Sequence, residues 1–186
     1  MEVQSLKISE VKLISPKKFG DERGFFQQTY HKKLYHDAGI IANFVQDNWS
    51  RSSKGVLRGL HYQLKNPQAK LVSVISGKVF DIAVDIRYAS PTFGQWVGAE
   101  LSDENGRQLF VPRGFAHGFI VLSNTVDFLY KCDNFYTPGD EYGVLWSDHN
   151  IGIEWPETGI HPIVSEKDKI APALGCVSIE NLPQYE

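Results

Sequence analysis

Residues 71–87, LVSVISGKVFDIAVDIR, decide the fold class. Two apolar runs flank Ser76-Gly77-Lys78, and a short connection with a central glycine is typical of a β-hairpin. In the second run the even-numbered positions 80–86 are all apolar, whereas the odd-numbered positions include Asp81 and Asp85. Because side chains of a strand point to alternate faces, both carboxylates lie on one face of a strand whose other face packs into a core.

The face that carries the carboxylates has two readings. If water covers it, Asp81 and Asp85 are ordinary surface residues. If it lines the inside of a closed β structure, they belong to a polar cavity, as in double-sheet jelly rolls that hold a ligand. Other expected strands also place titratable residues among apolar neighbours, which favours the second reading. We therefore predict a mainly β protein, a jelly-roll barrel with short peripheral helices.

The remaining elements are short and closely spaced. Residues 16–24 are expected to form a loop, 31–39 a two-turn helix ended by Gly39, and 165–172 a short helix with Ser165 as its N-cap. We predict one domain over 1–186, with the barrel over about 40–148 and with N-terminal strands in 8–30 and a C-terminal segment, 150–186, packed on it. The other expected strands are 11–14, 25–30, 44–50, 55–63, 95–101, 108–111, 117–122, 126–131 and 142–146.

Composition excludes several classes of protein. The chain has 186 residues, 42% of them hydrophobic, and a net charge of −3, which argues against a nucleic-acid partner. No apolar run approaches the ~20 residues of a membrane span, so we expect no membrane association. Cys132 and Cys176 show no metal-ligand spacing, and with no signal peptide at the N-terminus they predict a cytoplasmic protein.

The candidate chemistry centres on residues 55–70, GVLRGLHYQLKNPQAK, which combine His61 with Lys70. Charged groups in an apolar β structure are costly unless they are paired or used. His117 and Tyr130 have similar apolar neighbours, and each taken alone is more often a satisfied core residue than a functional one. Together these residues supply a base, an acid and a cation, which suits proton transfer next to a carbonyl group.

Strand alternation raises a difficulty for Arg58. It lies three positions before His61, so a regular strand points the two side chains to opposite faces. Gly59 lies between them and can host a β-bulge that resets the register. The sequence leaves this question open.

A metal site is a weaker alternative. Small β-barrels often bind metal through a His-x-His tripeptide, but the corresponding residues here are His61-Tyr62-Gln63, and glutamine is a poor transition-metal ligand. His117 joined to His61 still lacks a third ligand. We therefore expect no metal, and the chain carries no GxSxG, P-loop or GxGxxG motif for other chemistry.

Several long motifs follow one another along the chain. They are FGDERGFF (19–26), FVQDNWS (44–50), GVLRGLHYQ (55–63), FDIAVDIR (80–87), SPTFGQWVGAELSDEN (90–105), VPRGFAHGF (111–119), FLYKCDNFYTP (128–138) and IGIEWP (151–156). In this order they resemble the dTDP-4-dehydrorhamnose 3,5-epimerase family, from about residue 8 to about residue 175. The family is a cupin-type jelly roll that acts as a homodimer without metal or cofactor, so the resemblance implies these properties here. It also implies a role in dTDP-rhamnose biosynthesis, which supplies cell-envelope glycans such as lipopolysaccharide.

The resemblance also implies catalytic roles. The substrate is a dTDP-linked 4-keto-6-deoxyhexose, whose C4 ketone acidifies the protons on C3 and C5. His61 is then the base, oriented by Asp168, and Tyr130 is the acid that returns the proton. Lys70 is the cation near the enolate oxygen. Strand geometry alone makes Asp81 a plausible partner for Lys70.

The family match assigns further residues to substrate binding. Tyr136 and Phe19 are expected stacking partners for thymine. Gln28 stands where family members usually carry glutamate, which removes one negative charge near the nucleotide site. The remaining binding positions are Arg23, Gln46, Asp47, Asn48, Arg58, His117, Glu141 and Lys167, with Lys70 also contacting substrate.

Three functions remain open at this point. The first is epimerisation at both C3 and C5. The second is a 3-only or 5-only epimerase, or a ketoisomerase, acting on a related nucleotide sugar. The third is a sugar-binding protein without activity, which the presence of His61, Lys70, Tyr130 and Asp168 argues against.

Overall fold

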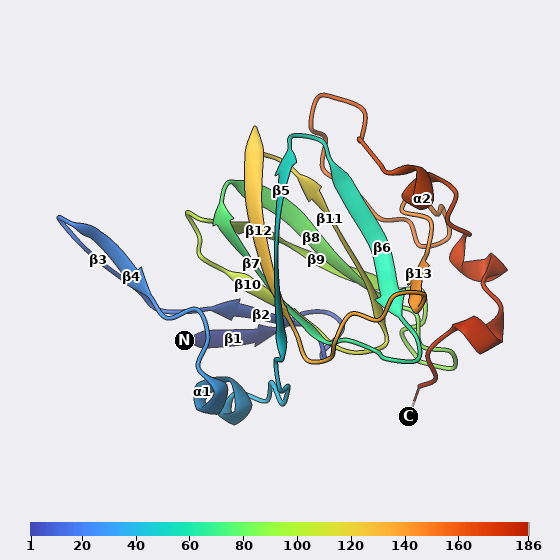
Figure 1. The fold of residues 1–186 in the computed structure, drawn as a ribbon, viewed down its shortest axis with the longest axis horizontal. Helices are drawn as coiled ribbons and strands as arrows, with labels where there is room; N and C mark the ends of the chain where they lie inside the picture. The colour runs from blue at the N-terminus through green and yellow to red at the C-terminus, as the bar shows by residue number, and fades with distance from the viewer. Residues whose placement is uncertain (186) are drawn as a thin grey trace.

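Two antiparallel sheets packed face to face form the body of the protein in a computed structural model that describes residues 1–185 (Figure 1). This mainly β architecture confirms the predicted jelly-roll class. The first sheet has the order β1 (Glu2–Ser5), β2 (Lys12–Ser15), β10 (Gln108–Val111), β7 (Lys70–Ser76), β12 (Thr125–Cys132) and β5 (Gln46–Ser53). The second has the order β13 (Glu141–Gly143), β6 (Leu57–Gln63), β11 (Phe115–Val121), β8 (Lys78–Asp85) and β9 (Trp96–Ser102).

Strand β8 is buried on both faces. Its odd-numbered apolar residues, Val79 and Ala83, belong to the core between the two sheets. Its even-numbered residues pack in a second cluster with residues of the C-terminal segment such as Leu174 and Leu182. Asp81 and Asp85 are both 0% exposed, so the reading of this face as solvated surface is wrong.

The helices are short and peripheral. Helix α1 (Lys32–Asp37) follows the N-terminal strands, and α2 (Glu166–Lys169) lies in the C-terminal segment with the 3₁₀ turns Leu174–Cys176 and Ile179–Asn181. Ser165 caps α2, because its hydroxyl oxygen accepts from the backbone N–H of Asp168, as predicted. In residues 1–185 no helix has the length and apolar character needed to cross a membrane.

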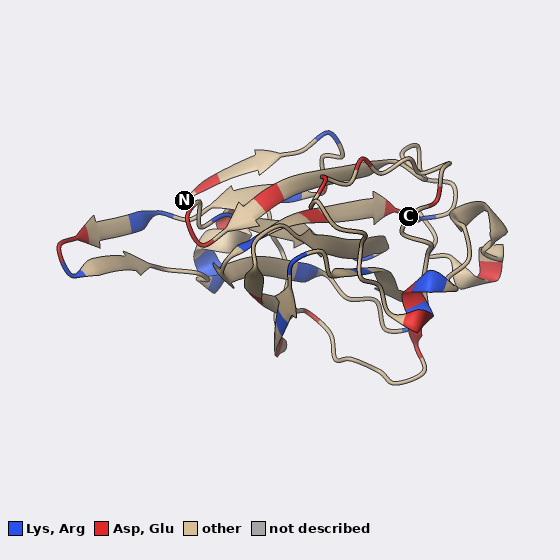
Figure 2. Cartoon of the chain, turned by 90° about the horizontal axis from the view of Figure 1, so that it is seen from above, with Lys and Arg blue, Asp and Glu red and all other residues tan. Residues whose placement is uncertain are grey.

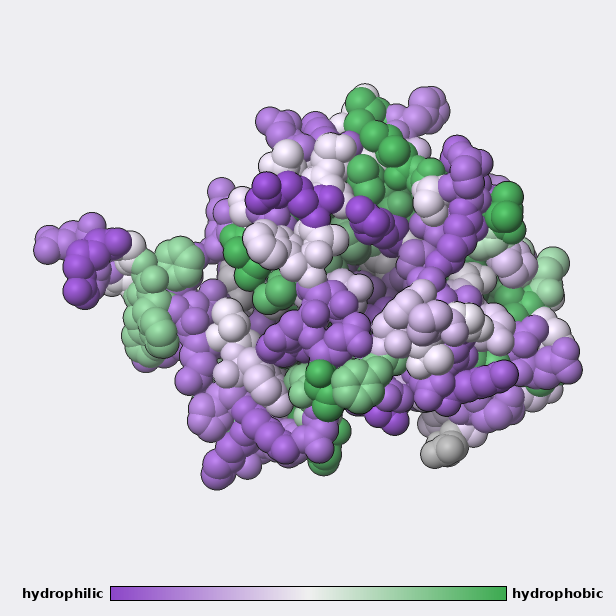
Figure 3. All heavy atoms as spheres, viewed as in Figure 1, coloured by the Kyte–Doolittle hydropathy of each residue, from purple (hydrophilic) through white to green (hydrophobic). Residues whose placement is uncertain are grey.

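The loop predicted over residues 16–24 is wrong. Strands β3 (Lys18–Asp21) and β4 (Gly24–Gln27) form a hairpin that pairs with neither sheet and projects from the body (Figure 1). Its strands lack apolar alternation because β3 is exposed throughout. Figure 2 shows charged residues at its tip, and Figure 3 shows hydrophobic residues between that tip and the body.

A β-bulge interrupts β6 at Gly59, as the sequence suggested. Strand β11 pairs His117 with His61 and Phe119 with Arg58, so two residue steps on β11 match three steps on β6. Because His117 and Phe119 share a face, Arg58 and His61 share it too. Gly59 has a φ of +136°, and a Cβ there would lie 2.6 Å from Cα of Gly118, so only glycine fits.

Candidate active site

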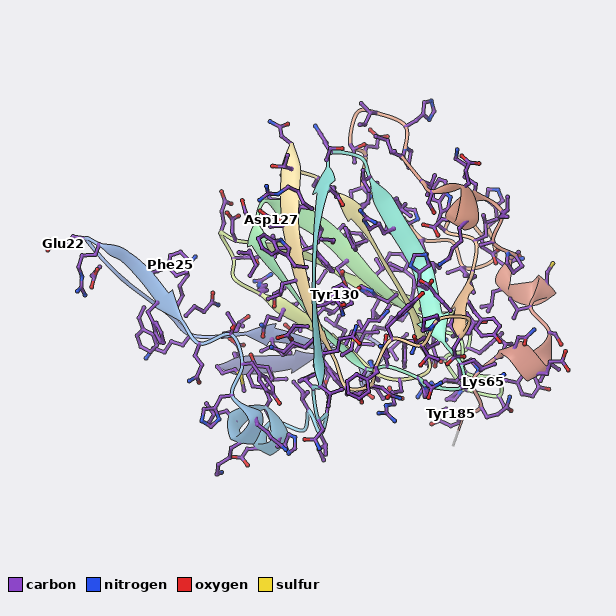
Figure 4. The ribbon with its side chains drawn as sticks, in the orientation of Figure 1. Glu22, Phe25, Lys65, Asp127, Tyr130 and Tyr185 are labelled. Carbon is purple, nitrogen blue, oxygen red and sulfur yellow. The ribbon has the colours of Figure 1, made fainter. Side chains whose placement is uncertain are left out.

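A polar cavity lies between the two sheets. It consists of adjoining recesses of about 200 and 510 Å³ that share five lining residues. Figure 4 shows one of them, Tyr130, near the middle of the molecule. The lining comes from both sheets, from β5, β7 and β12 on one side and from β6, β11 and β13 on the other, so the cavity lies between them. The carboxylate of Asp81 on β8 contacts it through His117. The shared lining residues are Asn48, His61, Lys70, Tyr130 and Glu141.

His61 and Asp168 form a hydrogen-bonded pair at this cavity. Nε2 of His61 lies 2.7 Å from Oδ1 of Asp168. Burial raises the pKa of Asp168, but hydrogen bonds from His61, from the Gly59 N–H and from Ser165 lower it on balance below 3.8. The carboxylate is therefore ionised, so Nε2 donates to it and Nδ1 is left with a free lone pair.

Helix α2 brings a second charged residue to the same place. Lys167 precedes Asp168, and its Nζ lies 2.6 Å from Oε2 of Glu141. The other carboxylate oxygen of Glu141 lies 3.9 Å from Nδ1 of His61. The imidazole therefore has a carboxylate on each side.

Tyr130 and Lys70 face His61 from the opposite sheet. Burial is the largest cause that raises the pKa of Tyr130 above 10.0, so its phenol is protonated near neutral pH. Burial lowers the pKa of Lys70 below 10.5, against the opposing effects of Cys132, Asp81 and Glu141. Within residues 1–185 Lys70 makes no ion pair, which leaves its ammonium available to a ligand in the cavity.

Asp81 pairs with a different residue from the one expected. Both its oxygens lie 3.0 Å from Nε2 of His117, and no ion pair joins it to Lys70 in the described part of the chain. Burial raises the pKa of Asp81, and the nearby charges of His117 and Lys70 offset this only in part. The expected Asp81–Lys70 pair is therefore wrong, although Lys70 still acts on Asp81 through its charge.

Comparison with known proteins identifies the family of this chain. The family model for dTDP-4-dehydrorhamnose 3,5-epimerase matches residues 5–175. The chain belongs to the dTDP-4-dehydrorhamnose 3,5-epimerase family. The Shigella flexneri dTDP-4-dehydrorhamnose 3,5-epimerase is 55% identical over 90% of this chain and 93% of its own. The Salmonella typhimurium enzyme is 54% identical over 90% and 92%.

A solved structure is similar over the whole fold. The dTDP-6-deoxy-D-glucose-3,5-epimerase of Legionella pneumophila, solved with dTDP-4-keto-L-rhamnose, shares 52% identity and a TM-score of 0.97. The likeness covers 100% of this chain and 98% of that one. The predicted family and the predicted class of enzyme, an isomerase, are therefore confirmed.

Apart from Lys70, Glu141 and Lys167, described above, the substrate-binding residues expected in this chain fall into two groups. Arg58, His117, Gln46 and Asn48 line the cavity with the catalytic candidates. Asp47 borders the same cavity, but its exposed carboxylate pairs with Lys131 at 2.9 Å.

The second group lies on the projecting hairpin or next to it. Arg23 is 84% exposed and pairs with Asp21, and Phe19 lies on the same hairpin. Gln28 follows β4 and is exposed. None of the three lines the cavity of its own chain. Figure 4 places Glu22, beside Arg23, at the end of the hairpin and far from Tyr130.

The sequence did not predict a functional role for Gln63; it indicated only that glutamine at this position is a poor ligand for a transition metal. Its side chain lies on the same face of β6 as His61, and the structure shows that both ends of its amide are hydrogen-bonded. The two-residue spacing from His61 was the available signal. Of the bonding partners only Asn66 is near in the chain, whereas Phe135 and Thr137 lie 72 and 74 positions away. Among the described residues no group of three or more His, Cys, Asp or Glu is placed to hold a metal ion.

Proposed function

We propose that this protein converts dTDP-4-dehydro-6-deoxy-D-glucose into dTDP-4-dehydro-L-rhamnose by epimerisation at C3 and C5, with Nδ1 of His61 as the base. The observation that carries the proposal is the 2.7 Å contact between Nε2 of His61 and Asp168. The ionised carboxylate keeps the proton on Nε2 and stabilises the positive charge that develops when Nδ1 takes a proton.

The positions of the other groups suit inversion at a carbon. His61 belongs to β6 in the five-stranded sheet, whereas Lys70 and Tyr130 belong to β7 and β12 in the six-stranded sheet. A sugar between the sheets meets the base on one face and the acid on the other. His61 removes the proton next to the ketone, Lys70 stabilises the enolate oxygen, and Tyr130 donates a proton from the opposite side.

The other residues of the cavity, with Lys167 beside Glu141, bind the nucleotide. Arg58, His117 and Lys167 supply positive charge or donors for the diphosphate, and a guanidinium suits it because of its bidentate geometry. Gln46, Asn48 and Glu141 offer hydrogen bonds to the sugar and the nucleoside. Tyr136 lines the cavity at its exposed rim and is placed to stack on the thymine ring. The reaction is redox-neutral and takes no metal or cofactor.

A homodimer completes the site in this proposal. The hairpin exposes Phe19, Phe25 and Phe26, an apolar surface that a monomer leaves in water. Arg23 and Gln28 lie outside the cavity of their own chain, so they reach a substrate only in a second copy. The neutral Gln28 then accepts and donates a hydrogen bond there.

The proposed setting is cytoplasmic, in line with the two free thiols of Cys132 and Cys176. Residues 1–186 form one epimerase domain. The product serves dTDP-rhamnose biosynthesis and, through it, cell-envelope glycans such as lipopolysaccharide.

Incubation with dTDP-4-dehydro-6-deoxy-D-glucose in D₂O tests the reaction. We expect deuterium at both C3 and C5 by NMR. Label at one carbon indicates a narrower epimerase, and no label rejects the activity. His61→Asn is expected to abolish labelling and to keep the fold, since it exchanges one polar ring for a smaller polar group.

A further inference from the structure

The side chain of Gln63 is buried and fully hydrogen-bonded beside the candidate active site. Its exposed fraction is 6%, and it lies two residues after His61 on the same face of β6. Nε2 donates to the carbonyl oxygens of Asn66, at 2.7 Å, and Phe135, at 3.2 Å. Oε1 accepts from the N–H of Thr137 at 2.8 Å.

Two of the three partners of Gln63, Phe135 and Thr137, belong to the segment that connects β12 to β13. Two more glutamines hold this segment, residues 134–137. Gln68 donates to the carbonyl of Asn134 at 2.8 Å, and Oε1 of Gln46 accepts from the N–H of Tyr136 at 2.9 Å. Gln63 makes two of these four contacts and brackets Tyr136 on both sides, at positions 135 and 137.

The fixed segment presents Tyr136 to the cavity. Tyr136 lines the same recess as His61, Lys70 and Tyr130, although it is 51% exposed. It lies near enough to Tyr130 to contribute to the raised pKa of that phenol, as a minor cause after burial. A half-exposed side chain on a loop has few contacts of its own, so its position depends on the anchoring of the backbone beneath it.

We propose that Gln63 is a positioning residue that acts through Tyr136: its amide fixes residues 135–137 so that the Tyr136 ring is preorganised as the wall against which the nucleotide sugar binds. The inference rests on the proposed function, in which Tyr136 contacts that ligand. Only an amide serves here, because the site needs two donors and one acceptor on one side chain. Glutamate lacks the donors, and methionine of similar length lacks all three groups.

Hydrogen exchange measures the anchoring without any substrate. In Gln63→Met we expect the amides of Tyr136 and Thr137 to exchange at least about tenfold faster than in the wild type, because Thr137 loses its acceptor. Gln68→Met is the matched control, since it removes one bond to residue 134 and leaves both neighbours of Tyr136 held. Should Gln63→Met fail to fold, Gln63→Glu keeps the shape and the acceptor for Thr137 but loses the donor to the Phe135 carbonyl. In that variant we expect faster exchange at Tyr136, whose N–H belongs to the same peptide unit as this carbonyl. Unchanged exchange at Tyr136 in the variant that folds overturns the proposal.

Steady-state kinetics measures the consequence. We expect Gln63→Met to raise KM by about tenfold and to leave kcat within about threefold of the wild-type value. The reason is that the Tyr136 ring contacts the bound substrate but not its reacting atoms. Tyr136→Ala is expected to raise KM similarly, and the double variant to be no worse than Tyr136→Ala alone. If Gln63→Met lowers only kcat, or if the effects of the two single variants on KM add up in the double variant, Gln63 does not act through Tyr136. A wild-type enzyme without turnover rejects the proposed function instead, and the exchange experiment then still decides the anchoring.

Discussion

Nε2 of His61 and Oδ1 of Asp168 meet at 2.7 Å, although 107 positions separate the two residues in the chain. His61 lies on strand β6 of the five-stranded sheet, whereas Asp168 lies on a helix of four residues near the C-terminus. The bulge at Gly59 connects them further, because the N–H of Gly59 also donates to Asp168, at 3.4 Å. The candidate base is therefore complete only when the C-terminal segment has packed on the five-stranded sheet.

Asp168→Asn tests the role of this carboxylate. The amide no longer stabilises an imidazolium and can donate to Nε2, which favours the wrong tautomer of His61. We expect kcat to fall by about 10²–10⁴-fold. The melting temperature is expected to change little, because asparagine still accepts from the Gly59 N–H.

Glu166→Gln is the matched control for this change. It removes one negative charge from the same helix, but Glu166 is exposed and, within residues 1–185, forms an ion pair only with Lys169. Its kcat is expected to stay within about twofold of the wild type, as for other surface pairs. A similar loss in both variants would assign the effect to the charge of α2 and remove the specific role of Asp168.

Tyr130→Phe separates proton removal from proton return. The variant keeps the ring in its place against Phe128, whose centroid lies 6.0 Å away, and loses only the hydroxyl. Product formation is expected to fall by about 10²-fold or more, and exchange of the C3 and C5 protons with solvent to fall less. Tyr30→Phe, a change outside the cavity, serves as control. Equal slowing of exchange and product formation would contradict the acid role.

We expect the loss of kcat/KM at alkaline pH to follow the deprotonation of Lys70. Its charged form stabilises the enolate, so activity is present below its pKa and lost as pH rises through it. Burial lowers that pKa below 10.5, whereas burial raises those of Tyr130 above 10.0 and of Cys132 to about 11. We expect kcat/KM to decline below pH 10.5. The residual activity of Tyr130→Phe should decline at the same pH; loss of the decline in that variant would assign it to Tyr130.

The local patterns of the sequence predicted much of the fold and of the cavity. The alternation in 78–87 predicted a strand with both carboxylates on one face, and the other titratable residues favoured the reading of that face as a cavity lining. The spacing of Arg58 and His61 marked Gly59 as a position that can host a bulge, but it left open whether a bulge forms. Both depend on neighbours in the chain, where periodicity is informative. Ser165 as an N-cap is local in the same way.

Contacts between residues far apart in the chain could not be predicted from the sequence. The choice of His117 as partner of Asp81 follows from the register of β8 with β11, which the sequence alone does not specify. Strand β4 falls partly within the strand predicted over 25–30, but β3 and its pairing with β4 were missed. The reason is that β3 buries neither face in its own chain and therefore lacks the apolar alternation that marks strands. The anchoring by Gln63 joins positions far apart and leaves no periodic signal.

Arg23 is expected to act in the cavity of a partner subunit. Its side chain is 84% exposed at the end of a hairpin that projects from its own chain (Figure 1). Arg23→Ala and His61→Asn are each expected to reduce activity strongly as pure homodimers. When the two variants are unfolded together and refolded as a mixture, half of the dimers combine one subunit of each kind.

In such a mixed dimer one cavity receives His61 from the first subunit and Arg23 from the second, while the other cavity lacks both. Activity is therefore expected to recover to about a quarter of the wild-type value per site. The control is a mixture of Arg23→Ala with Asp21→Ala, which keeps His61 in every subunit. A gain in activity in this mixture over the average of its two components is due to refolding and not to recovery in trans. If the first mixture stays as inactive as its components while its subunits exchange, Arg23 does not act in the partner's cavity.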